Sequence, residues 1–221
     1  MTSNFITSVL FAALVFAIVA CDSSDSSDPE QILPASLQTT IVENLAADPA
    51  TGRDPDTGQA IDTDRFTFFS LRENEVVLSY DEADRSDSLS TDWDIAFQST
   101  TILVNGGVDR LGDAGVQILT AAFEDVTEAP ADGYAQDAGN EYAIPAGSGD
   151  GWYNYDPATF IVSPIPGRVL VIRTADGRYA KIRILSYYEG NPVDIDPFAD
   201  QERFYTFEYA FQPDGSRSLV D

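Results

Sequence analysis

The amino-acid sequence predicts a mainly β protein built from antiparallel hairpins, on three observations. From Phe66 onward, the apolar residues fall in short runs that are rich in β-branched and aromatic side chains. Few of these runs reach the length of a helix, and the chain shows neither a long helical period nor an internal repeat. Turn-forming residues separate neighbouring runs, so we expect each strand to pair with its neighbour along the chain.

The N-terminal segment predicts a signal peptide and a lipid anchor. Residues 1–20 carry no charged side chain, and the apolar stretch 9–19 is short for a membrane span but typical of a signal peptide. The sequence IVAC at 18–21 has the aliphatic and small residues of a lipobox, and Cys21 is the only cysteine. We therefore expect a signal peptide at 1–20 and a diacylglycerol on Cys21. The alternative for this thiol is a buried structural cysteine.

The residues from Cys21 onward are predicted to form a tether and then one domain. The stretch 21–35 contains DSSDSSDPE, which is acidic and cannot form a core. It is interpreted as a flexible, lipidated tether. Residues 36–221 are long enough for a single β domain. The expected location is a membrane surface, from which the lipid suspends the domain.

The charge of the chain excludes one class of partner. Twelve basic residues stand against 37 acidic ones, and the formal net charge is −25 at pH 7. Because nucleic acid binding needs clustered basic residues, no nucleic acid partner is expected. Aspartates predominate and Lys181 is the only lysine, which favours a halophilic acidic protein whose self-repulsion is screened by salt. An acidic patch that steers a substrate is the alternative.

The expected strands follow one another along the chain. Residues 36–47 form one short helix or strand, and 47–64 form a loop marked by Pro, Gly and Asp. Strand-like runs then cover FTFFSL, EVVLSY, WDIAFQ, TILV and VQILTAAF. After a long loop at 124–151, the further runs are WYNY, TFIVSP, RVLVIRT, RYAKIRILSYY and FYTFEYAFQ.

Residues 169–188 predict the clearest hairpin. Its turn is placed at 175–177, where Gly177 can take a positive φ without penalty. On the second strand, alternation places the small and aliphatic side chains in the core, namely Ala180, Ile182, Ile184 and Ser186. The opposite face, expected to be wet or half-wet, carries Tyr179, Lys181, Arg183 and Leu185. The last strand presents a row of four aromatic side chains on one side, namely Tyr205, Phe207, Tyr209 and Phe211. We expect this row to lie in the core, and the alternative is that it forms a platform for a ligand.

Three stretches together resemble the HmuY family. They are WDIAF at 93–97, NGG at 105–107 and TADGRYAKIRILSYY at 174–188, and the likeness extends over roughly residues 62–216. Members of this family are lipid-anchored, mostly β proteins of Gram-negative bacteria, and the type members are surface haem-binding lipoproteins. The resemblance implies an HmuY-like fold, a twisted two-layer antiparallel β structure with projecting loops. It also implies an outer-membrane or cell-surface location and an outer-membrane transporter as a partner.

The WDIAF stretch is interpreted as a signature of the fold. Trp93, Ile95 and Phe97 are expected to alternate inward, while the aspartates and Gln98 face solvent or accept hydrogen bonds from turn amides. The NGG stretch at 105–107 is expected to allow left-handed backbone at the chain reversal. Asp92 and Asp94 are therefore structural in this interpretation, and neither is a catalytic group.

The resemblance makes haem a candidate ligand, but the family's usual iron ligands are missing. Relatives hold haem iron with paired histidines or with methionines, whereas this chain has no histidine and its one methionine is Met1. Phe160 stands at the place of a family histidine. Tyrosinate is another haem ligand, and the tyrosines in or beside the middle loops are Tyr134, Tyr142, Tyr153 and Tyr155. Alternatively these rings cap the core, and a porphyrin is held by stacking and arginine–propionate pairing.

An enzyme is not expected. Without histidine there is no Ser-His or Cys-His pair, and neither G-x-S-x-G nor H-E-x-x-H occurs. No metal site is predicted, because the carboxylates at 54–64 and 191–200 lack the spacing of a calcium loop. Two functions remain. The first is a lipoprotein that binds haem or another planar or apolar ligand without histidine, and the second is a structural or partner-binding lipoprotein with no cofactor.

Overall fold

A computed structural model describes residues 36–139 and 141–220 of the chain. The expected signal peptide at 1–20, the lipid on Cys21 and the tether at 21–35 lie outside the described residues, so all three stay predictions. Within the described part, no helix has the length and apolar character needed to cross a membrane.

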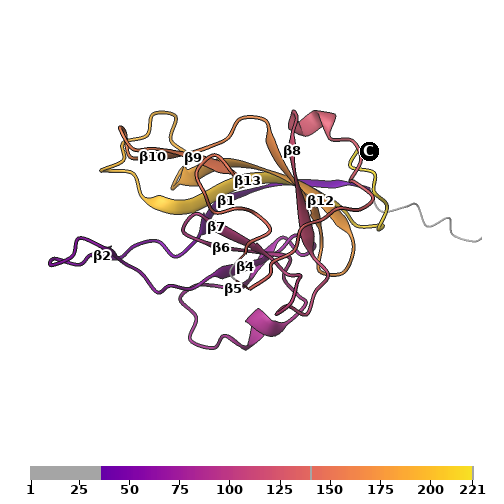
Figure 1. Cartoon of the computed structure of the whole chain (residues 1–221), viewed down its shortest axis with the longest axis horizontal. Coiled ribbons are helices and arrows are strands. Elements are labelled where there is room, and N and C mark those ends of the chain that lie inside the picture. The colour runs from indigo at the N-terminus through magenta and orange to yellow at the C-terminus, as the bar shows by residue number, and fades with distance from the viewer. Residues whose placement is uncertain (1–35, 140, 221) are drawn as a thin grey trace, which may run out of the picture. The chain divides into compact units, whose positions relative to one another are not determined.

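The larger sheet has five antiparallel strands. They are β1 (Gln38–Ala46), β8 (Gly115–Thr120), β11 (Arg168–Arg173), β12 (Tyr179–Tyr188) and β13 (Glu202–Gln212). Their order in the sheet is β1-β13-β12-β11-β8, so the two longest strands lie at its centre (Figure 1). The segment that the sequence left open between helix and strand is thus the edge strand β1, which pairs with β13.

The smaller sheet has four antiparallel strands from one continuous part of the chain. They are β4 (Thr67–Ser70), β5 (Glu75–Leu78), β6 (Ile95–Gln98) and β7 (Thr101–Val104), in the order β5-β4-β6-β7. The β6–β7 reversal lies at Ser99, which takes a positive φ of 46°. Each strand therefore pairs with a sequence neighbour, as the hairpin pattern predicted.

The main core lies between the two sheets. The ring of Phe97 on β6 stacks on that of Phe207 on β13, with centroids 5.5 Å apart. Phe69 on β4 meets Phe207 edge to face at 5.6 Å. Such aromatic pairs bury large apolar areas, and they join the layers as a single cluster. The prediction of a mainly β, two-layer antiparallel fold is confirmed.

Short elements project from this two-layer body. A ribbon is formed by β9 (Tyr153–Asp156) and β10 (Ile161–Pro164), and a second hairpin by β2 (Gly52–Arg53) and β3 (Ala60–Ile61). We call residues 49–63, which carry the second hairpin, the arm; it extends to the left in Figure 1. The helical turns of the described residues are the short 3-10 segments η1 (Ser86–Leu89) and η2 (Phe123–Asp125).

The WDIAF stretch is buried as predicted, with one correction. Ile95 and Phe97 belong to the core between the sheets. Trp93 is fully buried too, but it packs beneath the other face of the small sheet, with Phe68 and Ala96. The reason is that β6 begins only at Ile95, so strand alternation does not extend back to Trp93.

The hairpin at 169–188 is confirmed with a second correction. Gly177 has a φ of 82°, and its N–H donates to the carbonyl of Thr174 at 3.0 Å. Lys181, however, does not lie on a wet face, because its side chain is only 4% exposed. Its ammonium donates to the carbonyls of Phe123 and Val126, both at 2.9 Å. The segment around η2 therefore covers this part of the sheet and provides the acceptors that a buried ammonium needs.

The NGG stretch stands at a chain reversal, since Gly106 pairs antiparallel with Asp113. It opens the long connection from β7 to β8, and of its residues only Gly107 has a positive φ, 117°. A Cβ on Gly106 would lie 1.8 Å from the carbonyl oxygen of Ala114, and one on Gly107 would lie 1.8 Å from that of Asp137. The glycines are needed because other backbone segments pass at this distance.

Candidate functional site

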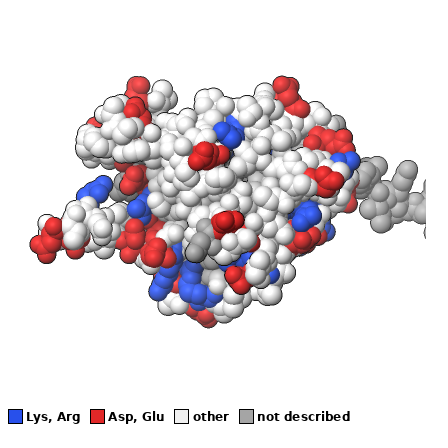
Figure 2. Space-filling view, in the orientation of Figure 1, with Lys and Arg blue, Asp and Glu red and all other residues white. Residues whose placement is uncertain are grey.

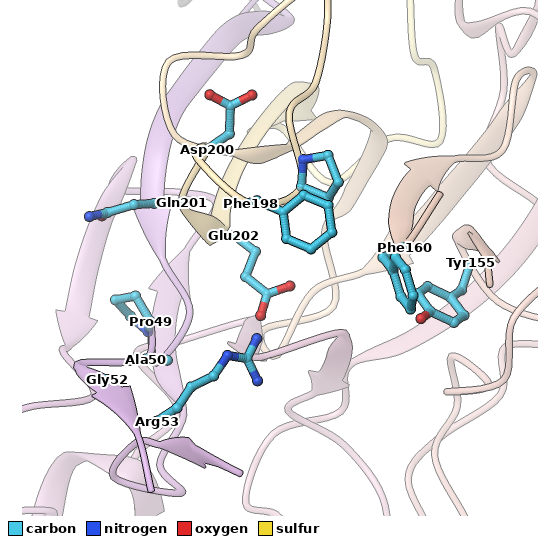
Figure 3. Close-up of a pocket in the computed structure, with 11 residues that line it drawn as sticks. Pro49, Ala50, Gly52, Arg53, Tyr155, Phe160, Phe198, Asp200, Gln201 and Glu202 are labelled. Carbon is cyan, nitrogen blue, oxygen red and sulfur yellow. The ribbon is translucent and has the colours of Figure 1, made fainter. Parts of the chain in front are cut away.

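A hollow lies between the arm, the β9–β10 ribbon and the loop that precedes β13. Its volume is about 710 Å³, within the range of about 300–1,000 Å³ that is usual for small-molecule sites. We call it the aromatic pocket (Figure 3). Its lining residues are Pro49, Ala50, Gly52, Arg53, Tyr155, Phe160, Pro197, Phe198, Asp200, Gln201 and Glu202.

Three aromatic side chains form one wall of the aromatic pocket. Tyr155 and Phe160 come from the ribbon, and Phe198 comes from the loop before β13 (Figure 3). The rings of Phe160 and Phe198 meet at 61° with centroids 6.2 Å apart. Phe160 is 56% exposed and Phe198 is 87% exposed. Such exposure of large apolar rings is unusual on a soluble surface and marks a contact site.

A tight turn in the ribbon orients Phe160 toward the pocket. The N–H of Phe160 donates to the carbonyl of Asp156 at 2.7 Å, and the backbone of Phe160 has a φ of 62°. The Asp156 carboxylate accepts from the amide of Ala158 at 2.9 Å and from the hydroxyl of Thr159 at 3.1 Å. Because a non-glycine residue with positive φ carries backbone strain, this geometry depends on the turn that surrounds it.

The opposite wall is polar and is provided by the arm and the start of β13. In Figure 3 the guanidinium of Arg53 and the carboxylate of Glu202 point toward each other. One guanidinium nitrogen of Arg53 also donates to the carbonyl of Gly58 at 3.2 Å, across its own hairpin. Asp200 is held through its carboxylate, which accepts from the amide of Asp196 at 2.8 Å.

The base of the arm is fixed by a buried carboxylate. Asp48 accepts from the amide of Thr63 at 2.9 Å and from the amide of Arg65 at 3.2 Å. Arg203 donates to the carbonyl of Asp48 at 2.8 Å and pairs with Asp62 at 2.7 Å. Both ends of the arm are therefore tied to the body beside β13, and Arg53 is held over the pocket by this connection.

The carboxylates of the pocket act on a neighbouring phenol. Burial raises the pKa of Tyr188, and the negative charges of Glu202 and Asp200 raise it further. The Tyr188 hydroxyl, in turn, accepts from the amide of Val162 at 3.0 Å on β10. The two carboxylates thus make the electrostatic potential near Tyr188 negative. The hydrogen bond between Val162 and Tyr188 also attaches the ribbon to β12 of the large sheet.

The structure brings one of the four predicted tyrosines to the pocket, Tyr155. Tyr153 is buried at the base of the same ribbon, and its hydroxyl donates to the carbonyl of Ala146 at 2.7 Å. Tyr134 packs against Tyr179 in a separate cluster, its hydroxyl donates to the carbonyl of Pro130 at 3.0 Å, and burial raises its pKa. Tyr142 is exposed and is not among the lining residues. The hydroxyls of Tyr153 and Tyr134 thus donate to backbone carbonyls, and neither residue lines the pocket.

Sequence reasoning missed two of the residues that shape the pocket, Phe198 and Arg53. They lie more than a hundred positions apart in the chain, and only the fold brings them to the same place. The sequence did contain an indication for Phe198. This large apolar ring lies in the Asp- and Pro-rich segment 191–200, outside every predicted strand, so it is expected to be exposed. Phe160 was singled out through the family resemblance alone, and it does line the pocket.

The residues present do not fit the iron ligation of the family's haem proteins. The lining of the pocket contains no histidine and no methionine, and Tyr155 is its only tyrosine. Within residues 36–139 and 141–220, no three His, Cys, Asp or Glu side chains converge as a metal site would require. The Asp54 carboxylate accepts from the amide of Thr57 at 2.7 Å and so closes a turn of the arm. Stacking, in contrast, fits the three exposed rings.

Comparison with known proteins finds similar solved structures and one matching family model. No curated protein matches the chain. The crystal structure of an apo HmuY analogue from Tannerella forsythia is similar at 15% identity and a TM-score of 0.45, over 81% of this chain and 98% of that one. Apo PinO from Porphyromonas gingivitis is similar at 15% identity and a TM-score of 0.43, over 81% and 99%.

A third structure, described as that of an HmuY-like haem-binding protein from Bacteroides vulgatus, has 17% identity and a TM-score of 0.41, over 78% of this chain and 90% of that one. The family assignment rests on the sequence itself, because the model of the HmuY protein family matches residues 62–168. That range holds the WDIAF stretch, the NGG stretch and the whole β9–β10 ribbon with Phe160. Through these residues, 62–168, the chain matches the HmuY family.

Proposed function

We propose that this chain is a ligand-binding lipoprotein of the HmuY type whose aromatic pocket holds haem or another planar, apolar ligand without a histidine. The observation that carries the proposal is the wall of three exposed rings, Tyr155, Phe160 and Phe198, on a hollow of about 710 Å³. The family match supports it, since Phe160 stands at the place of a family histidine and lines this hollow. A binding role also agrees with the expectation that the protein is not an enzyme.

The rings offer a planar ligand faces and edges to pack against. Aromatic pairs prefer edge-to-face or offset stacking at about 4.5–7 Å between centroids, and Phe160 and Phe198 already meet at 6.2 Å. A flat ligand that lies against one ring therefore meets the edge of the other. Arg53, on the opposite wall, is a hydrogen-bond donor for polar groups at the ligand's rim.

The proposed location is the outer membrane or the cell surface, with Cys21 acylated and residues 21–35 as the tether. This part of the proposal rests on the lipobox at 18–21 and on the family match. An outer-membrane transporter that receives the ligand is the partner proposed with it.

Titration with haemin tests the proposal. We expect Phe160→Ala to weaken binding about tenfold, because loss of one stacking ring costs about 1–3 kcal/mol. Tyr155→Phe keeps the ring and should change the dissociation constant by less than about threefold, whereas Tyr155→Ala should match Phe160→Ala. The measurement is quenching of tryptophan fluorescence in protein without a histidine tag, at molar salt.

Tyr142→Ala is the matched control, since Tyr142 is exposed but lies outside the pocket. Its dissociation constant should equal that of the wild type. Haemin affinity that is unchanged in Phe160→Ala, or that falls equally in Tyr142→Ala, would show that the aromatic pocket is not the site.

A partner-binding role is the second candidate, and one observation favours it. The loop before β13 exposes Val193 at 98% and Phe198 at 87%. A protein partner could bury both side chains, whereas a small ligand in the pocket would cover only Phe198. A variant of Val193 that loses capture by an outer-membrane transporter but keeps ligand affinity would support this second role.

A further inference from the structure

We propose that the aromatic pocket prefers a planar aromatic cation to an anionic planar ligand such as a porphyrin. This inference rests on the proposed function, because it names the charge class of the ligand that the pocket binds. Three features favour a cation: the charges in the pocket wall, the aromatic rings that line it and the electrostatic field of the whole chain.

The wall of the aromatic pocket carries more negative than positive charge. Of its lining residues, Asp200 and Glu202 are acidic, and Arg53 alone is basic. The nearby guanidinium of Arg203 is already paired with Asp62 at 2.7 Å. Arg53 itself shares its donors with the carbonyl of Gly58 at 3.2 Å. In Figure 3 the guanidinium of Arg53 also faces the carboxylate of Glu202, so Asp200 leaves the wall with a net negative charge. A ligand carboxylate would therefore meet a net negative wall whose single guanidinium is already partly occupied.

The aromatic wall adds to this preference. The faces of aromatic rings are electronegative, and a cation within about 6 Å of a ring centroid is attracted to them. Tyr155, Phe160 and Phe198 line the same hollow as Asp200 and Glu202. A flat cation gains stacking, cation–π attraction and carboxylate attraction together, while a flat anion gains only the stacking.

The field of the chain acts in the same direction. With a formal net charge of −25, the protein attracts cations toward its surface and repels anions. Figure 2 shows acidic side chains scattered over the visible face and interspersed with fewer basic ones. Because this field is screened over about 10 Å at 0.1 M salt and about 3 Å at 1 M, the local wall and the distant charges can be separated by salt.

A pair of pyrene derivatives with one ring system and opposite charges tests the inference. Pyrenylmethylammonium and pyrenesulfonate are titrated into the wild-type protein at 0.1 M and 1 M salt, and pyrene fluorescence is recorded. We expect the cation to bind about tenfold more tightly at 0.1 M. A smaller preference should persist at 1 M, since charges that line the pocket are screened less than distant surface charges.

Two double variants locate the effect. Asp200→Asn with Glu202→Gln should remove most of the preference for the cation. Asp87→Asn with Asp109→Asn removes the same two charges from exposed positions outside the pocket, and it should leave the preference nearly unchanged.

The possible outcomes distinguish failure of the charge preference from failure of the proposed function. If the sulfonate binds as tightly as the ammonium or more tightly, the inference falls and the proposed function stands. Equal loss of preference in both double variants would assign the effect to the overall charge and overturn the role of the pocket wall. If neither pyrene binds, the proposed function falls and the inference falls with it.

Discussion

Replacing Trp93 with alanine should lower the free energy of unfolding by about 3–5 kcal/mol, the usual cost of truncating a buried large aromatic side chain. The indole is fully buried and meets the ring of Phe68 edge to face at 4.7 Å. Its N–H donates to the carbonyl of Ser88 at 3.2 Å, and the guanidinium of Arg110 lies 5.5 Å from the ring centroid. The substitution removes all of these contacts and leaves a cavity under the small sheet.

Urea unfolding measures this loss, and two further variants serve as controls. Trp93→Phe keeps most of the volume, so it should lose less than Trp93→Ala. Phe198→Ala removes a ring that is 87% exposed, so its stability should stay within about 0.5 kcal/mol of the wild type. A Trp93→Ala protein as stable as Phe198→Ala would contradict the packing described for WDIAF.

Replacing Asp94 with alanine should cost about 3 kcal/mol, because two buried amides then lose a charged acceptor. One carboxylate oxygen accepts from the amide of Leu71 at 2.8 Å, and the other accepts from the amide of Ala175 at 2.9 Å. Leu71 follows β4 of the small sheet, and Ala175 lies in the turn between β11 and β12 of the large sheet. The carboxylate therefore joins the two layers, which explains why a polar residue stands inside an apolar stretch.

Asp92 provides the matched control, since it is an exposed aspartate in the same motif. Asp92→Ala should change the free energy of unfolding by less than about 0.5 kcal/mol. Equal effects of Asp92→Ala and Asp94→Ala would show that the contacts of Asp94 with the two amides do not stabilise the fold.

The pH dependence of the Asp94 contribution has a definite sign. Burial raises the pKa of Asp94 from 3.8 to about 6 in the folded protein. The folded state therefore binds this proton more tightly than the unfolded chain does, and the contribution of Asp94 becomes more favourable as the pH falls from 7 toward 4. The free energy of unfolding of the wild type relative to Asp94→Asn should rise by about 2.4 kcal/mol over that range. A difference that is constant or falls would contradict this assignment.

The pattern of alternation predicted much of the fold. The aromatic row of the last strand is buried in the core, with Tyr205 and Phe207 fully enclosed. The burial of Ile95 was predicted for the same reason, because period-two patterns determine which face of a strand is buried. The turn at Gly177 was predicted separately, from the tolerance of glycine for a positive φ. The pattern failed where a residue lies outside a regular strand, as Trp93 does, or where a distant segment covers a face, as η2 covers Lys181.

The candidate site was less predictable for a physical reason. The walls of the pocket come from loops and hairpin tips, where no periodicity relates a residue to its surroundings. The sequence offered four tyrosines by type and position in the long loops, and the structure brings only Tyr155 to the pocket. Arg53 and Phe198 reach it through the arm and through the loop before β13, whose positions depend on contacts such as those of Asp48 that alternation does not reveal.

The central claim is that the aromatic pocket holds a planar ligand by ring stacking and not by coordination of an iron atom in the ligand. The most direct test compares haemin with metal-free protoporphyrin, which has the same ring and the same propionates, in protein without a histidine tag at molar salt. Because the pocket offers stacking and neither imidazole nor thioether, the two dissociation constants should agree within about threefold, and both should rise about tenfold in Phe160→Ala. Haemin that binds a hundredfold more tightly than the metal-free ring, with a low-spin six-coordinate spectrum, would contradict the account.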